Sequence, residues 1–182
     1  MNVAIFDYGT GNLHSLRKAI EETGARVSFV QDARSAASAD ALVLPGVGAF
    51  GSAAARLTRS GAELRDAIRN GLPTLGICLG MQLLFDRSDE GSGNGLGVIP
   101  GRVRKMKADR LPQMGWNEVE TTADPLFDAL PSLTVYYANS YVARPARQEY
   151  VIAWSEHAGE RFPAAVRSGS AIGVQFHPEK SG

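Results

Sequence analysis

The sequence predicts an α/β fold built around a mainly parallel β-sheet, and three observations lead to this prediction. In the first half, short apolar runs alternate with stretches of helical spacing, which is the pattern of βαβ units. Chemically reactive residues directly follow these runs, as expected at the carboxyl ends of parallel strands. In the second half the runs are short and rich in β-forming residues, which indicates antiparallel strands and hairpins packed onto the parallel core.

Each expected element rests on its own local pattern. An apolar run without alternation predicts an interior strand at 2–6, and further strands are expected at 26–30, 41–44 and 72–77. Helices are expected at 13–23, 33–39, 52–59, 62–70 and 79–85, and Gly24 ends the first of them. Beyond a loop at 89–97, strands are expected at 102–107, 116–120, 134–137, 150–154, 164–167 and 171–176, with a helix at 125–130.

Composition limits the class of protein. The 182 residues suffice for one domain, and 44% hydrophobic with 21% charged residues is ordinary for a globular chain. Basic and acidic residues are equal at 19 each, which gives no argument for a nucleic-acid or membrane partner. One cysteine excludes an internal disulfide and fits a reducing compartment. The N-terminal sequence MNVAIFDYG contains an acidic residue and a glycine before its apolar run is long enough for a signal peptide. A cytoplasmic location is therefore the default expectation.

The only cysteine, Cys78, lies between Gly76 and Gly80 at the junction of an expected strand and an expected helix. A lone free cysteine is usually a small buried hydrophobe. However, the order of a strand, a Gly-x-Cys-x-Gly turn and a helix is the thiol form of the nucleophile elbow. In this motif a sharp turn exposes the nucleophile, and the glycines avoid steric crowding. The helix start favours a thiolate, and the N–H of Leu79 is placed to hold an oxyanion.

A second segment completes a catalytic set with Cys78. The chain has three histidines, and His177 begins a His-Pro-Glu sequence at the end of an expected strand. Extended residues two apart point to the same side, so His177 and Glu179 are expected to project together. The imidazole takes the thiol proton and the carboxylate orients the imidazole, which makes a Cys–His–Glu triad. The turn Gly46–Val47–Gly48 follows a neighbouring strand and offers further oxyanion donors, although it also fits an ordinary strand–helix turn.

These motifs resemble a known family. GICLGMQ around Cys78, with the downstream HPE, resembles the class I, triad-type glutamine amidotransferases. Further stretches resemble the branch of glutaminase subunits that serve imidazole glycerol phosphate synthase in histidine biosynthesis: FDYGTGNLHS (6–15), LPGVGAFG (44–51), MGWNEV (114–119), YANSY (137–141) and FHPEKSG (176–182). The resemblance covers nearly the whole chain, and it implies a three-layer αβα, flavodoxin-like fold with antiparallel strands in the second half.

The same resemblance implies a reaction and a partner. Glutamine is hydrolysed through a γ-glutamyl thioester on Cys78, without a cofactor or metal. The ammonia passes to a (β/α)₈-barrel cyclase subunit in a heterodimer, which makes imidazole glycerol phosphate and an aminoimidazole carboxamide ribonucleotide. The matched positions are Gln82, Glu90, Ser140 and Tyr141 for glutamine, Gly46, Val47, Gly48 and Leu79 for the oxyanion, and Asn12, Trp116 and Lys180 for the cyclase.

Two departures from the family pattern carry expectations of their own. Asn139 stands where the family often has histidine, and little loss is expected because the pocket uses mainly backbone there. The sequence ends at Gly182, just past the triad, so we expect a single amidotransferase domain over 1–182 that lacks a short C-terminal closing element.

Three other interpretations stay open from the sequence. One is another class I glutaminase, such as those serving pyridoxal phosphate or anthranilate synthesis, against which MGWN and DYGTGNL argue. Another is a cysteine peptidase or chaperone-like protein with a similar elbow, which is not expected to carry HPE at the chain end. The last is a non-catalytic relative that only binds a partner, which the intact Cys78, His177 and Glu179 disfavour.

Overall fold

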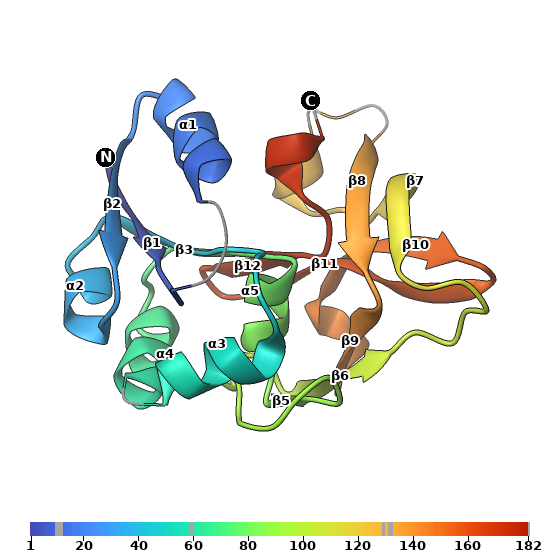
Figure 1. The fold of residues 1–182 in the computed structure, drawn as a ribbon. Helices are drawn as coiled ribbons and strands as arrows, with labels where there is room; N and C mark the ends of the chain where they lie inside the picture. The colour runs from blue at the N-terminus through green and yellow to red at the C-terminus, as the bar shows by residue number, and fades with distance from the viewer. Residues whose placement is uncertain (10–12, 59, 129, 131–132, 182) are drawn as a thin grey trace.

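A large twisted sheet forms the centre of the molecule in the computed structural model, which describes residues 1–9, 13–58, 60–128, 130 and 133–181 (Figure 1). Within these residues nine strands form one sheet of order β2-β1-β3-β4-β12-β11-β10-β7-β8. The strands from β2 to β12 in that order are mutually parallel. They are β1 (Asn2–Phe6), β2 (Arg26–Val30), β3 (Ala41–Leu44), β4 (Thr74–Ile77) and β12 (Ala171–Val174). The parallel sheet expected for the first half is thus confirmed.

The remaining strands of this sheet are antiparallel, and they come from the second half of the chain. They are β7 (Gln113–Thr121), β8 (Leu133–Asn139), β10 (Val151–His157) and β11 (Glu160–Ser168). Strand β12 pairs in parallel with β4 on one side and antiparallel with β11 on the other. The antiparallel strands expected in the second half are thus confirmed, and β12 joins four of them edge to edge to the parallel strands in one sheet.

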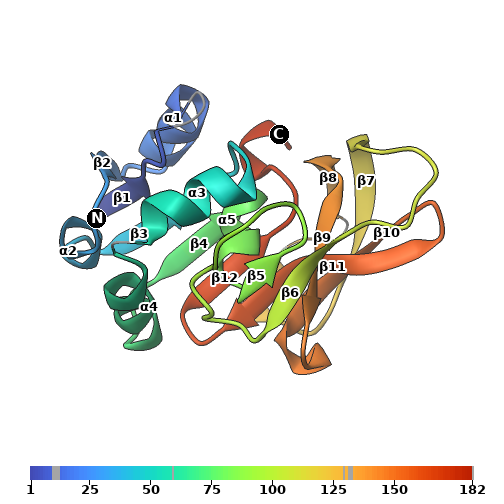
Figure 2. The same cartoon turned by 60° about the horizontal axis from the view of Figure 1, so that its bottom comes forward.

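A smaller sheet lies on one face of the large one. It consists of β5 (Arg87–Ser88), β6 (Gly101–Lys105) and β9 (Tyr141–Pro145), in the order β5-β6-β9. Strands β5 and β9 were not expected from the sequence, because β5 is two residues long and β9 continues directly from the end of β8. In the view of Figure 2, β5 and β6 lie in front of β11 and β12.

Helices cover both faces of the sheet. Helix α1 (His14–Glu22) lies on one face, and α2 (Ala33–Ala37), α3 (Phe50–Leu57), α4 (Gly61–Arg69) and α5 (Leu79–Leu83) lie on the other (Figure 1). Short 3₁₀ turns are η1 (Pro125–Phe127), η2 (Gln148–Tyr150) and η3 (Pro178–Lys180). Of the helix expected at 125–130, the described residues form the single turn η1, and residue 129 lies outside them. Asp124 caps this turn by accepting a hydrogen bond from the Leu126 N–H. No helix in the described part of the chain is long and apolar enough to cross a membrane.

Two hydrophobic clusters hold these layers together. In β1, Val3 and Ile5 belong to the cluster on the α1 face, whereas Ala4 and Phe6 belong to the cluster on the opposite face. This division follows from the alternation of side chains along a strand. Because both faces of the parallel strands are covered, their sequences are continuously apolar.

Candidate active site

Cys78 occupies a strained turn between β4 and α5. Its backbone has φ 47° and ψ −103°, a left-handed conformation that a non-glycine residue rarely adopts. A Cβ on Gly76 would lie 2.6 Å from the carbonyl oxygen of Gly80, and a Cβ on Gly80 would overlap the carbonyl group of Leu44. The elbow therefore needs both glycines because strand β3, strand β4 and helix α5 approach one another too closely for side chains.

His177 and Glu179 form a hydrogen-bonded pair at the start of η3. Nδ1 of His177 lies 2.9 Å from Oε1 of Glu179, and both side chains are largely buried. The His177 N–H donates to the carbonyl of Tyr136 at 2.9 Å, which attaches this segment to β8. The pair was expected to project from a strand end, but β12 ends at Val174 and Glu179 lies in a 3₁₀ turn. The turn brings the carboxylate back to the ring, so the pair still forms.

The His177 ring faces Cys78 across Gly46. A Cβ placed on Gly46 would lie 3.0 Å from both the Cβ of Cys78 and the Cε1 of His177, so the two side chains converge on this glycine. Burial disfavours the charged ring, but hydrogen bonds with Cys78 and Glu179 outweigh it and raise the pKa of His177 to about 9. Burial also opposes the charge on Glu179, but its bond to His177 keeps the pKa of that carboxyl below the usual range. The arrangement stabilises an imidazolium beside the sulfur.

Gln175 contacts Cys78 and was not among the site residues predicted from the sequence. Its side chain is fully buried, and its Nε2 donates a hydrogen bond to Sγ of Cys78 at 3.5 Å. Its Oε1 accepts a hydrogen bond from Nε2 of Gln82 at 3.3 Å. A signal was present in the sequence, since Gln175 lies two residues before His177 at the end of the strand expected at 171–176, and residues two apart in a strand point to the same side.

A pocket of about 240 Å³ opens in front of Cys78. This volume lies just below the usual range of ligand pockets and suits a ligand as small as an amino acid. The structure brings most of the predicted residues together here, because the pocket is lined by Gly46, Gly48, Leu79, Gln82, Glu90, Ser140 and Tyr141 in addition to Cys78. Asn139, Ala138 and Pro112 complete the lining, and Val47 is not part of it.

The polar residues of this pocket are held in place by backbone contacts. Gln82 is buried, and its Nε2 donates to the carbonyl of Tyr141 at 3.1 Å. Glu90 accepts a hydrogen bond from the N–H of Phe50 at 3.2 Å, at the start of α3. Nδ2 of Asn139 donates to the same Tyr141 carbonyl at 3.2 Å, whereas its buried Oδ1 has no partner. Gln82 is thus a buried part of the pocket wall, whereas Glu90 lines the pocket as an exposed residue whose carboxylate contacts the start of α3.

An exposed aromatic face lies beside the triad. Trp116 on β7 is 58% exposed and packs edge-on against Tyr136 of β8, with ring centroids 6.1 Å apart. Nζ of Lys180 lies 5.7 Å from the centroid of the Tyr136 ring. Met114, two residues before Trp116 on the same side of β7, is 68% exposed. The structure thus brings together two of the residues expected at a partner interface, while Asn12 lies outside the described residues.

Comparisons with known proteins identify the family of this chain. The model of the family described as "Glutamine amidotransferase class-I" matches residues 4–182. A solved glutamine amidotransferase superposes with a TM-score of 0.75, at 20% identity over 97% of this chain and 90% of the other. The chain therefore belongs to the class-I glutamine amidotransferases.

Two curated relatives narrow the family further. A protein of Carboxydothermus hydrogenoformans is 50% identical over 98% of this chain and 92% of its own length. A protein of Gloeobacter violaceus is 46% identical over 99% of this chain and 83% of its own length. Both are named imidazole glycerol phosphate synthase subunit HisH. Within the class-I amidotransferases, these identities place the chain in the family of those subunits.

Proposed function

We propose that this chain is the glutaminase subunit of an imidazole glycerol phosphate synthase and that Cys78, His177 and Glu179 carry its reaction. The observation that carries the proposal is the convergence of Cys78 and the His177–Glu179 pair on Gly46 beside an amino-acid-sized pocket. Nε2 of His177 takes the thiol proton, because Nδ1 is occupied by Glu179. The sulfur then attacks the side-chain amide carbon of glutamine.

The tetrahedral intermediate collapses with loss of ammonia, to which His177 gives the proton that it took from the thiol. A γ-glutamyl thioester remains on Cys78. Water, activated by the same imidazole, attacks the thioester carbonyl and releases glutamate and the free thiol. Glu179 stabilises the imidazolium in both halves of the reaction, which agrees with the raised pKa of His177.

Backbone donors stabilise the oxyanion of each tetrahedral intermediate. The N–H of Leu79 follows the nucleophile directly, as in other nucleophile elbows. The turn of Gly46, Val47 and Gly48 supplies the second donor. Gly48 has φ 103°. Because glycine adopts positive and negative φ with similar ease, the peptide bond next to Gly48 is free to rotate. Rotation of this peptide is expected to switch the site between a resting and an active state.

The remaining pocket residues hold the amino-acid end of glutamine. Glu90 carries a negative charge at the pocket wall and receives the α-ammonium group. Backbone groups of Ser140 and Tyr141 receive the α-carboxylate, and Gln82 supports this segment through the Tyr141 carbonyl. No role for a cofactor or metal is needed in these steps.

The ammonia is used by a partner subunit. We expect a cyclase with a (β/α)₈ barrel to dock on the face formed by Met114, Trp116, Tyr136 and Lys180. In this face the exposed Trp116 packs against Tyr136 of β8, and the carbonyl of Tyr136 accepts the hydrogen bond from the His177 N–H. An apolar aromatic centre with a charged rim is typical of an interface hot spot. Binding of a partner at this face is expected to affect the position of His177, because the Tyr136 carbonyl accepts a hydrogen bond from the His177 N–H.

The decisive measurement is glutamate release from glutamine by the chain alone and with a cyclase subunit and its nucleotide ligand. We expect little turnover alone and strong stimulation in the complex, because an unformed oxyanion hole costs several kcal/mol of transition-state stabilisation. Cys78→Ala is expected to abolish turnover under both conditions. Unchanged activity of Cys78→Ala would contradict the mechanism. Activation only by the synthase partner of another amidotransferase would identify a different pathway.

A further inference from the structure

Three arginines form a row across the small sheet. Arg87 of β5 pairs in register with Arg102 of β6, and Arg102 pairs with Arg144 of β9. Residues in register on neighbouring strands project from the same face of a sheet. Val103, the next residue of β6, is fully buried and faces the core. The three arginine side chains therefore leave the small sheet on the face opposite to that of Val103.

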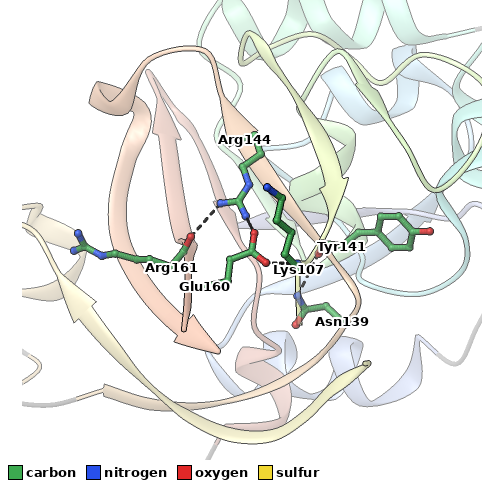
Figure 3. A network of polar contacts seen from close by, with 6 residues as sticks. All are labelled: Lys107, Asn139, Tyr141, Arg144, Glu160 and Arg161. Atoms are coloured by element: carbon green, nitrogen blue, oxygen red, sulfur yellow. Dashed lines mark hydrogen bonds and ion pairs between the residues drawn. The ribbon is translucent and has the colours of Figure 1, made fainter. Parts of the chain in front are cut away.

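Such a row is costly without counter-charges, because like charges directly opposite each other destabilise a sheet. Two carboxylates offset part of the charge: Asp89 pairs with Arg102, and Glu160 pairs with Arg144. Figure 3 shows Glu160 between Arg144 and the backbone of Lys107, from which it also accepts a hydrogen bond. Arg144 donates to the carbonyl of Arg161 at 3.0 Å as well, so its guanidinium group is fixed from two sides.

The row lines a groove of about 920 Å³, which shares no lining residue with the glutamine pocket. The groove is lined by two carboxylates, those of Asp86 and Glu160, and by six cationic side chains: Arg87, Arg102, Arg104, Lys105, Lys107 and Arg144. The whole chain has equal numbers of basic and acidic residues, so this excess is a local concentration. Arg87, Arg104 and Lys105 form no ion pair with any described residue, and the buried Nε of Arg102 has no hydrogen-bond partner.

We propose that this groove binds a small molecule that carries phosphate groups. Guanidinium groups present paired N–H donors that match phosphate oxygens, and three of them in one row suit a ligand with more than one phosphate. The volume lies within the usual range for small-molecule sites and accommodates a nucleotide. A hollow with cations on its walls suits a compact ligand better than the flat surface of an acidic protein.

The test is titration calorimetry of the full chain with inorganic pyrophosphate and, separately, with ATP at low ionic strength. We expect saturable 1:1 binding of at least one probe, and affinity that falls steeply with added salt. Tighter binding of ATP than of pyrophosphate would identify a nucleotide as the class of ligand. Equal affinities for the two probes would show that the groove recognises the phosphate groups alone.

Two variants locate the site. Arg102→Gln removes the centre of the row, and Arg104→Gln removes an exposed cation without a partner, whose loss does not endanger folding. Each is expected to weaken binding about tenfold, while Arg26→Gln, an exposed arginine on edge strand β2, leaves it unchanged. Glutamine hydrolysis is expected to persist in all three variants, so the result is independent of the proposed glutaminase activity. Absence of binding by both probes, or equal affinities for the wild type and both groove variants, would overturn the proposal.

Discussion

The side-chain amide of Gln175 donates a hydrogen bond to Sγ of Cys78 at 3.5 Å, and its oxygen is held by Gln82. A chain of two buried glutamines thus runs from the carbonyl of Tyr141, in the pocket wall, to the nucleophile. This contact holds the sulfur in a fixed direction. We therefore expect Gln175 to act as a positioning residue in the proposed reaction.

Replacing Gln175 by methionine is expected to lower kcat about tenfold or more, because small displacements of a nucleophile are costly in rate. Alkylation of Cys78 by iodoacetamide is expected to slow as well, since the donor to the sulfur is lost. A merely structural role would change the melting temperature and not the alkylation rate of the folded protein. Gln31→Met, at an exposed glutamine, is the matched control.

The His177–Glu179 pair predicts a pH-dependent stability. The folded-state pKa of His177, about 9, is above its unfolded value of about 6.5, so this contribution is complete below pH 6.5 and is lost as the pH rises to about 9. The pKa of Glu179 is lowered in the folded state, so the contribution of its carboxylate is lost at acidic pH, below its ordinary pKa of 4.5.

Glu179→Gln is accordingly expected to reduce the free energy of unfolding by about 1.5–3 kcal/mol at pH 6, the range for a hydrogen bond to a charged group. The deficit is expected to shrink at pH 9.5. Urea denaturation of both proteins at the two pH values measures it. A deficit that is the same at both pH values would show that the pair does not hold an imidazolium.

Gly46→Ala is expected to separate the nucleophile from its base. The added methyl group would lie 3.0 Å from the Cβ of Cys78, the Cε1 of His177 and the carbonyl oxygen of Ile77, which is closer than carbon atoms ordinarily approach. We expect kcat/KM to fall about 100-fold with a small change in melting temperature. Gly61→Ala, where the new methyl group meets only Leu96 at 3.9 Å, is expected to keep full activity.

Trp116→Ala is expected to weaken the complex with the cyclase at least tenfold, because large exposed aromatic residues at interface centres carry much of the binding energy. Glutamate release by the complex should then require more cyclase for half-maximal stimulation. Phe29→Ala is the control, since Phe29 is 45% exposed on edge strand β2, at the opposite end of the sheet from β7 and β8. Equal losses in both variants would argue against the proposed docking face.

The sequence by itself determined the features that depend on local chain properties. Continuous apolar runs identified β1, β3 and β4, and the spacing of glycines around Cys78 identified the elbow. The His-Pro-Glu segment identified the partners of the thiol, although the 3₁₀ turn at Pro178 was not foreseen. Each of these signals lies within a few residues, where the conformational preferences of the backbone act directly.

Only the tertiary structure decided what depends on pairing between distant segments. Strand β12 lies between β4 and β11, so the parallel strands of the first half and the antiparallel strands of the second half form one sheet. The sequence does not show this order, because strand order is set by long-range packing and not by local propensity. The contact of Gln175 with Cys78 joins residues 97 positions apart. The row of Arg87, Arg102 and Arg144 arises from the register of three strands, which no single stretch of the sequence contains.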